Sequence, residues 1–521
     1  FYTLYGHNTV GSVLKNKIGA KIKKGDIIAE IANYPENGNW APHLHFQIML
    51  STLNYKIDFP GVCYYNQIEI WKDLCPNPNL LFKSLALNYT NDKSDDELIK
   101  YRKKHLGKSL KLHYEEPINI VRGEGVYLIS KNGRKYLDTI NNVAHVGHEN
   151  ESVVIEGQNQ MSILNTNSRY LHKSINELAE EIIQTLPKKL NVIHFVNSGS
   201  EANELAIRMM KSHTGSNDII VSENGYHGNT NICVDISSYK FDGKGGKGAP
   251  ENTHVIPMPT KFNGKHKGEN ASKGYISEIE NSINNLKSKN RGLGGFIIEP
   301  IISCGGQVEL PDGFLKTAYD LIRKNGGICI SDEVQVGCGR LGESFWGFEL
   351  HDVIPDIITI GKPLGNGHPI GAVVCTSEIA ESFANGMEFF NTFGGNPVSC
   401  SIATQVLKVV KSENLQKNAK TIGDYFKKEL KKLSDKYDII GDVRGQGLFL
   451  GIEFVDHKMN PLFKETKYII NRLKNFGILA SLDGPNNNVI KIKPPLIFSK
   501  DNCDMFIFYL HKILEEDFLN K

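Results

Sequence analysis

The chain shows two patterns of apolar and polar residues, with the change before about residue 95. From there to Lys521, helical periods of apolar residues alternate with short β-branched runs. Strands separated by helices are typical of a parallel sheet covered on both faces. The pattern predicts an α/β fold with a mostly parallel sheet, and a smaller α+β lobe from about residue 410. Its strands are predicted at 193–196, 219–221, 296–298, 328–331 and 357–360.

The front of the chain is punctuated by glycine, asparagine and proline. Its short runs at Lys21–Glu30 and Leu44–Leu50 are typical of β-rich structure. A polar segment, residues 88–96, is expected to cap a helix that starts before Glu97. This shift in composition predicts the domain limits. They are a partial β-rich domain over 1–75, a linker over 76–100 and an α/β domain over 101–521, with its large part at about 150–400 and the preceding segment joining the small lobe.

Composition narrows the classes of function. The 521 residues include 60 basic and 58 acidic residues, a balance that favours neither nucleic acid nor a membrane surface as partner. Nine cysteines without zinc or disulfide spacing predict a reducing, cytoplasmic location. No apolar run approaches the roughly 18 residues that span a bilayer. Because the first residue is Phe1 rather than Met, we expect the chain to begin inside a longer protein.

Two charged residues at predicted strand ends are the first candidates for chemistry. Lys362 follows the run 357–360, and Asp332 follows the run 328–331. A lysine can form a Schiff base with a carbonyl cofactor, and an aspartate can keep a pyridine nitrogen protonated. Ligands of open α/β sheets bind at the carboxyl ends of the strands, where both residues are expected. The alternative is that Asp332 only caps the next element.

Two further motifs suit the same cofactor. Residues 197–203 (NSGSEAN) follow a strand and open a helix, so free backbone N–H groups and the helix dipole could hold a phosphate. Residues 225–228 (GYHG) place Tyr226 between glycines, where its ring could stack on a planar heterocycle. Taken singly, the first motif is equally a capped helix and the second a surface turn.

Together these motifs resemble the class III aminotransferase family over about residues 100–521. The resemblance implies a fold-type I enzyme with pyridoxal 5′-phosphate as cofactor. It makes Lys362 the Schiff-base lysine and Asp332 the partner of the pyridine nitrogen. The other cofactor contacts that it implies are Gly199 and Ser200 at the phosphate, Tyr226, His227 and Val334 around the ring, and Gln335 at the ring oxygen.

The segment 391–397 (NTFGGNP) resembles the family segment in which a threonine reaches the cofactor phosphate of the neighbouring subunit. The resemblance therefore places Thr392 in the active site of a partner chain. A homodimer with shared active sites is the expected assembly.

The substrate side departs from the family pattern. Family members carry a glutamate that neutralises the arginine of an Arg-Gly-x-Gly-Leu motif; here Cys304 takes the place of that glutamate, and Arg444 is retained. A guanidinium without an internal carboxylate would be free to bind a substrate phosphate. The alternative is a salt bridge from Arg444 to another carboxylate.

Several segments resemble the family's phospho-lyases, which act on phosphoethanolamine or phosphohydroxylysine. In residues 491–495 (KIKPP), lysine stands where many transaminases have arginine, so Lys491 is a second candidate for substrate binding. The resemblance implies a lyase that eliminates phosphate from a small phosphorylated amine to give an aldehyde and ammonia. An ω-aminotransferase is the alternative, followed by a non-catalytic binding protein. The other segments that carry this resemblance are 140–148, 164–172, 386–390 and 483–485.

A second resemblance concerns residues 1–50. Residues 5–7 (YGH) and 42–46 (PHLHF) are similar to lysostaphin-type zinc endopeptidases. Alternation along a strand puts His43 and His45 on one face. The resemblance implies His45 as a zinc ligand and His7 and His43 as catalytic residues. The His-x-x-x-Asp element that supplies two more ligands is absent, so we expect His45 to be only a remnant and the domain to be inactive. A cell-wall peptidase with an inert transaminase fold is the rival interpretation; the intact Lys362 and Asp332 argue against it.

Overall fold

The computed structural model describes residues 2–519 except 24, 38, 40–41, 56–58, 61–62, 65–66, 77 and 79–92. The chain divides into two compact units, Phe1–Lys111 and Leu112–Lys521. The predicted linker, 76–100, lies largely outside the described residues. The domain limits therefore stay a prediction.

In the first unit, β1 (Tyr2–Gly6) and β2 (His45–Met49) form a short antiparallel pair, with Gly6 opposite His45. Its helices are α1 (Val10–Val13), α2 (Ile68–Leu74) and α3 (Asp95–His105). The capped helix expected near Glu97 is confirmed, because Ser94 and Glu97 form a capping box at the start of α3. The strand expected within 21–30 is wrong for the described residues, which form none; Ile22 and Ile27 are exposed and have no buried face to pack.

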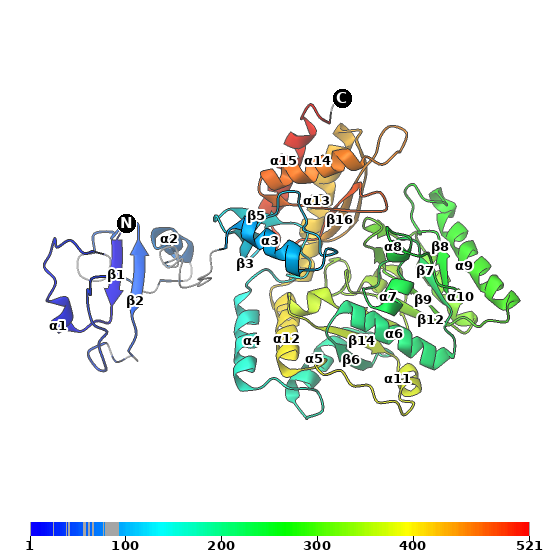
Figure 1. The fold of residues 1–521 in the computed structure, drawn as a ribbon, viewed down its shortest axis with the longest axis horizontal. Helices are drawn as coiled ribbons and strands as arrows, with labels where there is room; N and C mark the ends of the chain where they lie inside the picture. The colour runs from blue at the N-terminus through cyan, green and yellow to red at the C-terminus, as the bar shows by residue number, and fades with distance from the viewer. Residues whose placement is uncertain are drawn as a thin grey trace. The chain divides into compact units, whose positions relative to one another are not determined.

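The second unit is built around a seven-stranded sheet with the order β6-β14-β13-β12-β9-β7-β8 (Figure 1). Strand β14 is antiparallel to β6 and β13, and the other neighbours are parallel. The predicted mostly parallel α/β sheet is confirmed. Its strands are β6 (Val192–Val196), β7 (Ile219–Ser222), β8 (Thr253–Ile256), β9 (Gly295–Ile298), β12 (Ile328–Asp332), β13 (Ile357–Ile360) and β14 (Gly371–Cys375).

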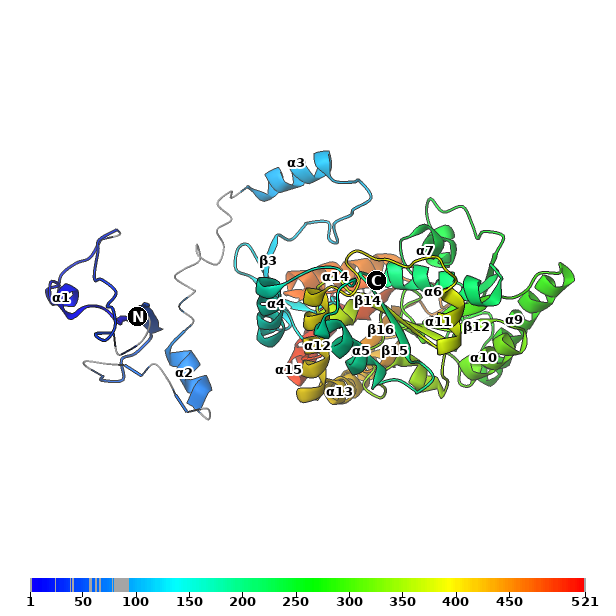
Figure 2. The ribbon, with the colours of Figure 1, turned by 90° about the horizontal axis from the view of Figure 1, so that it is seen from below.

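Helices cover both faces of this sheet because alternate strand residues point to opposite sides. Phe296 and Ile298 join one apolar cluster with residues of α5 (Lys173–Ile183), α9 (Ala271–Ser288), α10 (Phe314–Lys324) and α12 (Pro397–Ser412). Ile297, between them, joins a second cluster on α6 (Gly199–Thr214) and α11 (Ser377–Phe383). Helices α9 and α10 lie side by side at one end of the sheet in both ribbon views (Figures 1 and 2).

The small lobe combines a four-stranded antiparallel sheet with three helices. The strand order is β15-β16-β19-β18, and a third apolar cluster fills its interior. A second small sheet pairs β17, from this lobe, with three strands of the segment that precedes the large sheet. The elements of both sheets are β3 (Ile120–Glu124), β4 (Tyr127–Ser130), β5 (Lys135–Asp138), β15 (Ile440–Gln446), β16 (Phe449–Phe454), β17 (Ile478–Leu479), β18 (Ser481–Asp483), β19 (Val489–Ile492), α13 (Leu415–Lys436), α14 (Phe463–Asn475) and α15 (Lys500–Leu514).

The remaining elements are short connections, apart from helix α4. They are α4 (Glu151–Ile163), α7 (Asn231–Asp235), α8 (Ser238–Phe241), the pair β10 (Ile301–Ile302) and β11 (Val308–Glu309), and 3-10 turns at Gly268–Asn270, Gly347–His351 and Lys362–Gly365. Among the residues that the structure describes, no helix combines the length and apolarity needed to cross a bilayer.

Helix α13 approaches the β15–β16 hairpin closely at Gly423. A Cβ atom there would lie 2.2 Å from the carbonyl oxygen of Gly447. We predict that Gly423→Ala lowers the thermal midpoint of unfolding, because about 1–3 kcal/mol of overpacking outweighs the gain in helix propensity. Asp424→Ala, at the next, exposed position of the same helix, is the control. Equal midpoints for the two variants would contradict this close packing.

Candidate active site

Lys362 and Asp332 lie together at the carboxyl ends of two neighbouring parallel strands. Asp332 ends β12 and is paired in register with Thr359 of β13, and Lys362 opens the turn that follows β13. Both line a cavity of about 290 Å³. Gly199, Ser200, Tyr226, His227, Val334 and Gln335 line the same cavity. The structure thus brings together the residues that were predicted to surround one cofactor.

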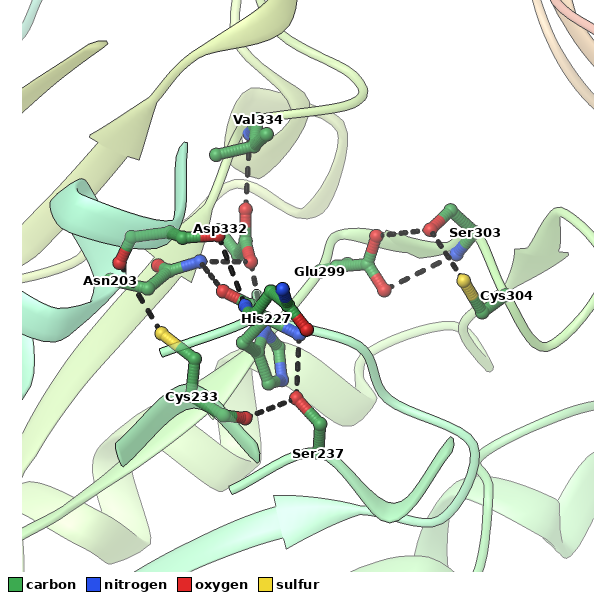
Figure 3. Close-up of polar contacts among 11 residues, drawn as sticks. Asn203, His227, Cys233, Ser237, Glu299, Ser303, Cys304, Asp332 and Val334 are labelled. Carbon is green, nitrogen blue, oxygen red and sulfur yellow. Dashed lines mark hydrogen bonds and ion pairs between the residues drawn. The ribbon is translucent and has the colours of Figure 1, made fainter. Parts of the chain in front are cut away.

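The carboxylate of Asp332 is buried and held from three sides. Its Oδ2 accepts a hydrogen bond from Nδ2 of Asn203 at 2.8 Å and lies 2.8 Å from Nδ1 of His227, and its Oδ1 accepts from the backbone N–H of Val334 at 3.1 Å (Figure 3). His227 is itself positioned by Ser237, whose Oγ accepts the His227 backbone N–H at 2.8 Å. These contacts fix the direction of the carboxylate without closing the cavity.

Helix α6 supplies an anion-binding end to the cavity. Ser198 caps the helix, and Gly199 is its first residue. A Cβ on Gly199 would lie 2.7 Å from Cγ1 of Val334, so only glycine allows this approach. The unpaired N–H groups and the dipole of a 16-residue helix favour a phosphate here.

Buried polar atoms in this region are consistent with a missing partner. Oδ1 of Asn203 and Nε2 of His227 have no hydrogen-bond partner among the described residues. Buried polar atoms are normally paired with protein, water or a ligand. With Asp332 for a ring nitrogen, the start of α6 for a phosphate and Lys362 for a carbonyl carbon, the residues present fit pyridoxal phosphate.

Glu299 is a site residue that the sequence did not single out. It is buried at the cavity wall, and its Oε1 accepts a hydrogen bond from Oγ of Ser303 at 2.5 Å (Figure 3). Burial, followed by the charge of Asp332, raises the pKa of Glu299 well above its usual range. Burial also raises the pKa of the neighbouring Cys304 thiol, to about 12, so this thiol carries no charge near neutral pH.

Gln335 is held by two side chains that were assigned no role. Its Oε1 accepts a hydrogen bond from Nδ2 of Asn142 at 2.7 Å and another from Nζ of Lys493 at 3.3 Å. This directs the Nε2 group of Gln335 away from both donors. Asn142 and Lys493 belong to segments 140–148 and 491–495, which resemble the phospho-lyases. That resemblance was the only sign in the sequence that these two residues could belong to the site.

The prediction of an unpaired Arg444 is wrong. Its Nη1 lies 2.5 Å from Oε2 of Glu453 and 3.0 Å from Oδ2 of Asp442, and its Nε donates to the carbonyl of Gly306. The side chain faces a different cavity, of about 690 Å³, rather than the one around Lys362. The salt-bridged alternative holds because the β15–β16 hairpin brings Glu453, nine residues further along the chain, beside Arg444, a cross-strand contact that the motif does not reveal.

The remaining predicted residues stay predictions. Lys491 lies in the small lobe, with its Nζ 3.5 Å from Oδ2 of Asp483. Thr392 is exposed and does not line the cavity of its own chain. In the first unit, the ring of His7 lies 4.4 Å from that of His43 and 5.9 Å from that of His45, between centroids. Within the described part of the chain, no group of three or more potential metal ligands comes together.

A lysine and an aspartate on adjacent strands beside a phosphate-binding helix end define a fold-type I pyridoxal-phosphate enzyme. The family model for class III aminotransferases matches residues 111–514. The chain therefore belongs to the class III aminotransferase family, whose enzymes use pyridoxal phosphate.

Relatives of both reaction types are similar to this chain. An alanine–glyoxylate aminotransferase 2-like protein of Drosophila melanogaster is 44% identical over 83% of this chain and 90% of its own length. An ethanolamine-phosphate phospho-lyase homolog of Caenorhabditis elegans is 38% identical over 81% and 94%. A phospholyase from Arthrobacter, solved in complex with phosphoethanolamine, superposes with a TM-score of 0.77 at 35% identity, covering 80% of this chain and 99% of that one.

The pairing of Arg444 predicts a structural rather than a substrate-binding role. We expect Arg444→Met to lower the stability of the protein by about 3 kcal/mol, because it leaves two carboxylates without their cation. The apparent KM for the substrate should change less than twofold in the folded fraction. The measurements are thermal unfolding of the holoenzyme and steady-state kinetics; a large rise in KM with unchanged stability would reverse the assignment.

Proposed function

We propose that this chain is a pyridoxal-phosphate-dependent lyase that eliminates phosphate from a small phosphorylated amine. The candidate substrates are O-phosphoethanolamine and phosphohydroxylysine, and the products are an aldehyde, ammonia and inorganic phosphate. The alternative is transfer of the amino group to a keto acid.

The charge of the substrate side is the observation that carries this proposal. Cys304 is a neutral thiol at the place where the family pattern has a carboxylate. Lys491 and Lys493 lie nearby, and Asp483 is the carboxylate that pairs with Lys491. A region with two lysines and the carboxylate of Asp483 suits a substrate group that carries more than one negative charge. The phospho-lyase names of two relatives point in the same direction.

The transaminase alternative has its own support. The Drosophila relative is named for an aminotransferase and shares 44% identity with this chain. Lys362 and Asp332 would serve either reaction, since both begin with loss of a proton from the carbon that bears the amine. The substrate therefore decides the outcome: a phosphate on the adjacent carbon is a leaving group, and without one the proton returns and the amino group is transferred.

Different residues of the chain have different roles in the proposed elimination. The bound cofactor supplies an electron sink for the carbon that loses its proton. Nζ of Lys362 would take that proton, and the carboxylate of Asp332 would hold the ring nitrogen and keep it positive. Asn203 and His227 hold Asp332 in that direction. The adjacent carbon–oxygen bond then breaks, phosphate leaves with the bonding electrons, and water converts the unsaturated amine to aldehyde and ammonia.

A homodimer with shared sites is part of the proposal. Thr392 is exposed, and so are its neighbours Met387, Phe390 and Phe393. Apolar side chains gathered on one exposed segment favour a protein interface. A second copy of this chain would place Thr392 at the partner's cofactor phosphate.

We predict equal release of phosphate and ammonia from O-phosphoethanolamine or phosphohydroxylysine, abolished by Lys362→Ala. The reason is that no other side chain replaces the amine that takes the proton. Lys464→Ala, an exposed lysine on α14, is the control and should keep full activity. Cofactor absorbance with no phosphate released from either compound would contradict the lyase proposal.

A further inference from the structure

We propose that Lys493, together with Lys491, forms the subsite that binds the dianionic phosphate group of the substrate. The inference rests on the proposed function and names the residues that recognise its leaving group. The ammonium of Lys493 is the group whose positive charge is not balanced by a nearby carboxylate of the described residues.

The two lysines are placed side by side by strand geometry. Lys491 lies within β19, and Lys493 follows directly after its end. Residues two apart along an extended chain point to the same side. The backbone N–H of Lys493 donates to the carbonyl of Thr139 at 2.6 Å, which anchors the segment beyond the strand. Two ammonium groups are therefore directed toward one region.

Lys493 is the less neutralised of the two. Lys491 has Asp483 at 3.5 Å, but no carboxylate of the described residues lies within 4.0 Å of Nζ of Lys493. The Lys493 residue is 5% exposed, and its Nζ donates a hydrogen bond to Oε1 of Gln335 at 3.3 Å. An ammonium has three donors. Burying a cation with unused hydrogen-bond donors costs folding free energy unless an anion pairs with it.

The surrounding charges make this site responsive to an anion. Burial, followed by the charge of Lys491, lowers the pKa of Lys493 to about 7, against the opposing effect of the Asp483 carboxylate. A bound anion would stabilise the ammonium and draw a proton onto it. The affinity for an anion should accordingly be highest below about pH 7 and fall as the pH rises.

The position of Lys493 links the subsite to the reacting centre. Gln335, which its ammonium contacts, lines the same cavity as Lys362, whereas neither Lys491 nor Lys493 is among the residues that line it. The ligand expected to reach both Lys362 and the Lys493 subsite is a short amine. Its amino group would lie near Lys362, and the adjacent carbon would carry the phosphate. The rival anion is the ring oxygen of the cofactor, which the family resemblance places near Gln335.

Sulfate binding to the holoenzyme distinguishes these two possible partners of Lys493, the substrate phosphate and the ring oxygen. In the holoenzyme the cofactor already occupies its own phosphate site. Sulfate is a dianion that does not titrate between pH 6 and pH 9, unlike phosphate. We expect calorimetric titration to show sulfate binding at pH 6 that weakens at pH 9. In Lys493→Met, binding at pH 6 should be weaker by about tenfold or more. In Lys493→Arg, binding should persist at pH 9, because a guanidinium stays charged.

Lys474→Met is the matched control for the loss of a buried lysine. Lys474 is 8% exposed and already has the carboxylate of Glu116 as its partner, so its loss should leave sulfate affinity unchanged. Unchanged sulfate affinity in Lys493→Met, with a shifted cofactor absorbance, would assign Lys493 to the ring oxygen and overturn the inference. If Lys493→Met does not fold, Lys493→Arg decides: affinity at pH 9 as weak as in the wild type overturns it.

The same measurements distinguish the two proposals. Sulfate binding through Lys493 without phosphate release from either amine would leave the anion subsite standing and remove the lyase function. Phosphate release by Lys493→Met with the wild-type KM would leave the lyase function standing and remove the subsite.

Discussion

The buried carboxylate of Asp332 is the constraint on which the site depends. It ends a central strand of the large sheet, where it is held by Asn203 from α6 and His227 from the loop after β7. A carboxylate removed from water needs such donors, so the sheet, the helix and the loop must all be in place before the charge can be accommodated. The cofactor pocket therefore forms only when the large sheet, helix α6 and the loop after β7 have folded together.

A second constraint is which charged side chains near the proposed substrate site are paired within the protein. Arg444 is neutralised by Glu453 and Asp442 within the small lobe, and Cys304 contributes no charge. Of the two lysines at β19, Lys491 lies 3.5 Å from the carboxylate of Asp483, whereas Lys493 donates to the neutral Gln335. Arginine would carry its charge at any pH, whereas a buried lysine can lose its proton when no anion is bound. Under the proposed function, this difference would suit an anion that binds and leaves in each turnover.

Much of the large sheet could be predicted because its central strands are buried on both faces and appear as continuous β-branched runs. Strands β8 and β14 were not predicted: β8 lies at the edge with polar Thr253 and His254, and β14 (GAVVC) runs antiparallel after a glycine-containing loop. Lys362 and Asp332 could be found because Asp332 ends a strand and Lys362 comes two residues after one. The partner of Arg444 could not, since it depends on hairpin register, and neither could Lys493, whose burial is set by tertiary packing.

The partition between elimination and transfer tests the account most directly. The holoenzyme would be given O-phosphoethanolamine or phosphohydroxylysine together with glyoxylate as an amino acceptor, and the nitrogen counted as free ammonia or as glycine. The account predicts that nitrogen appears as ammonia in equal amount with inorganic phosphate, whether or not glyoxylate is present. Nitrogen recovered as glycine, with the phosphate still bound to carbon, would contradict it.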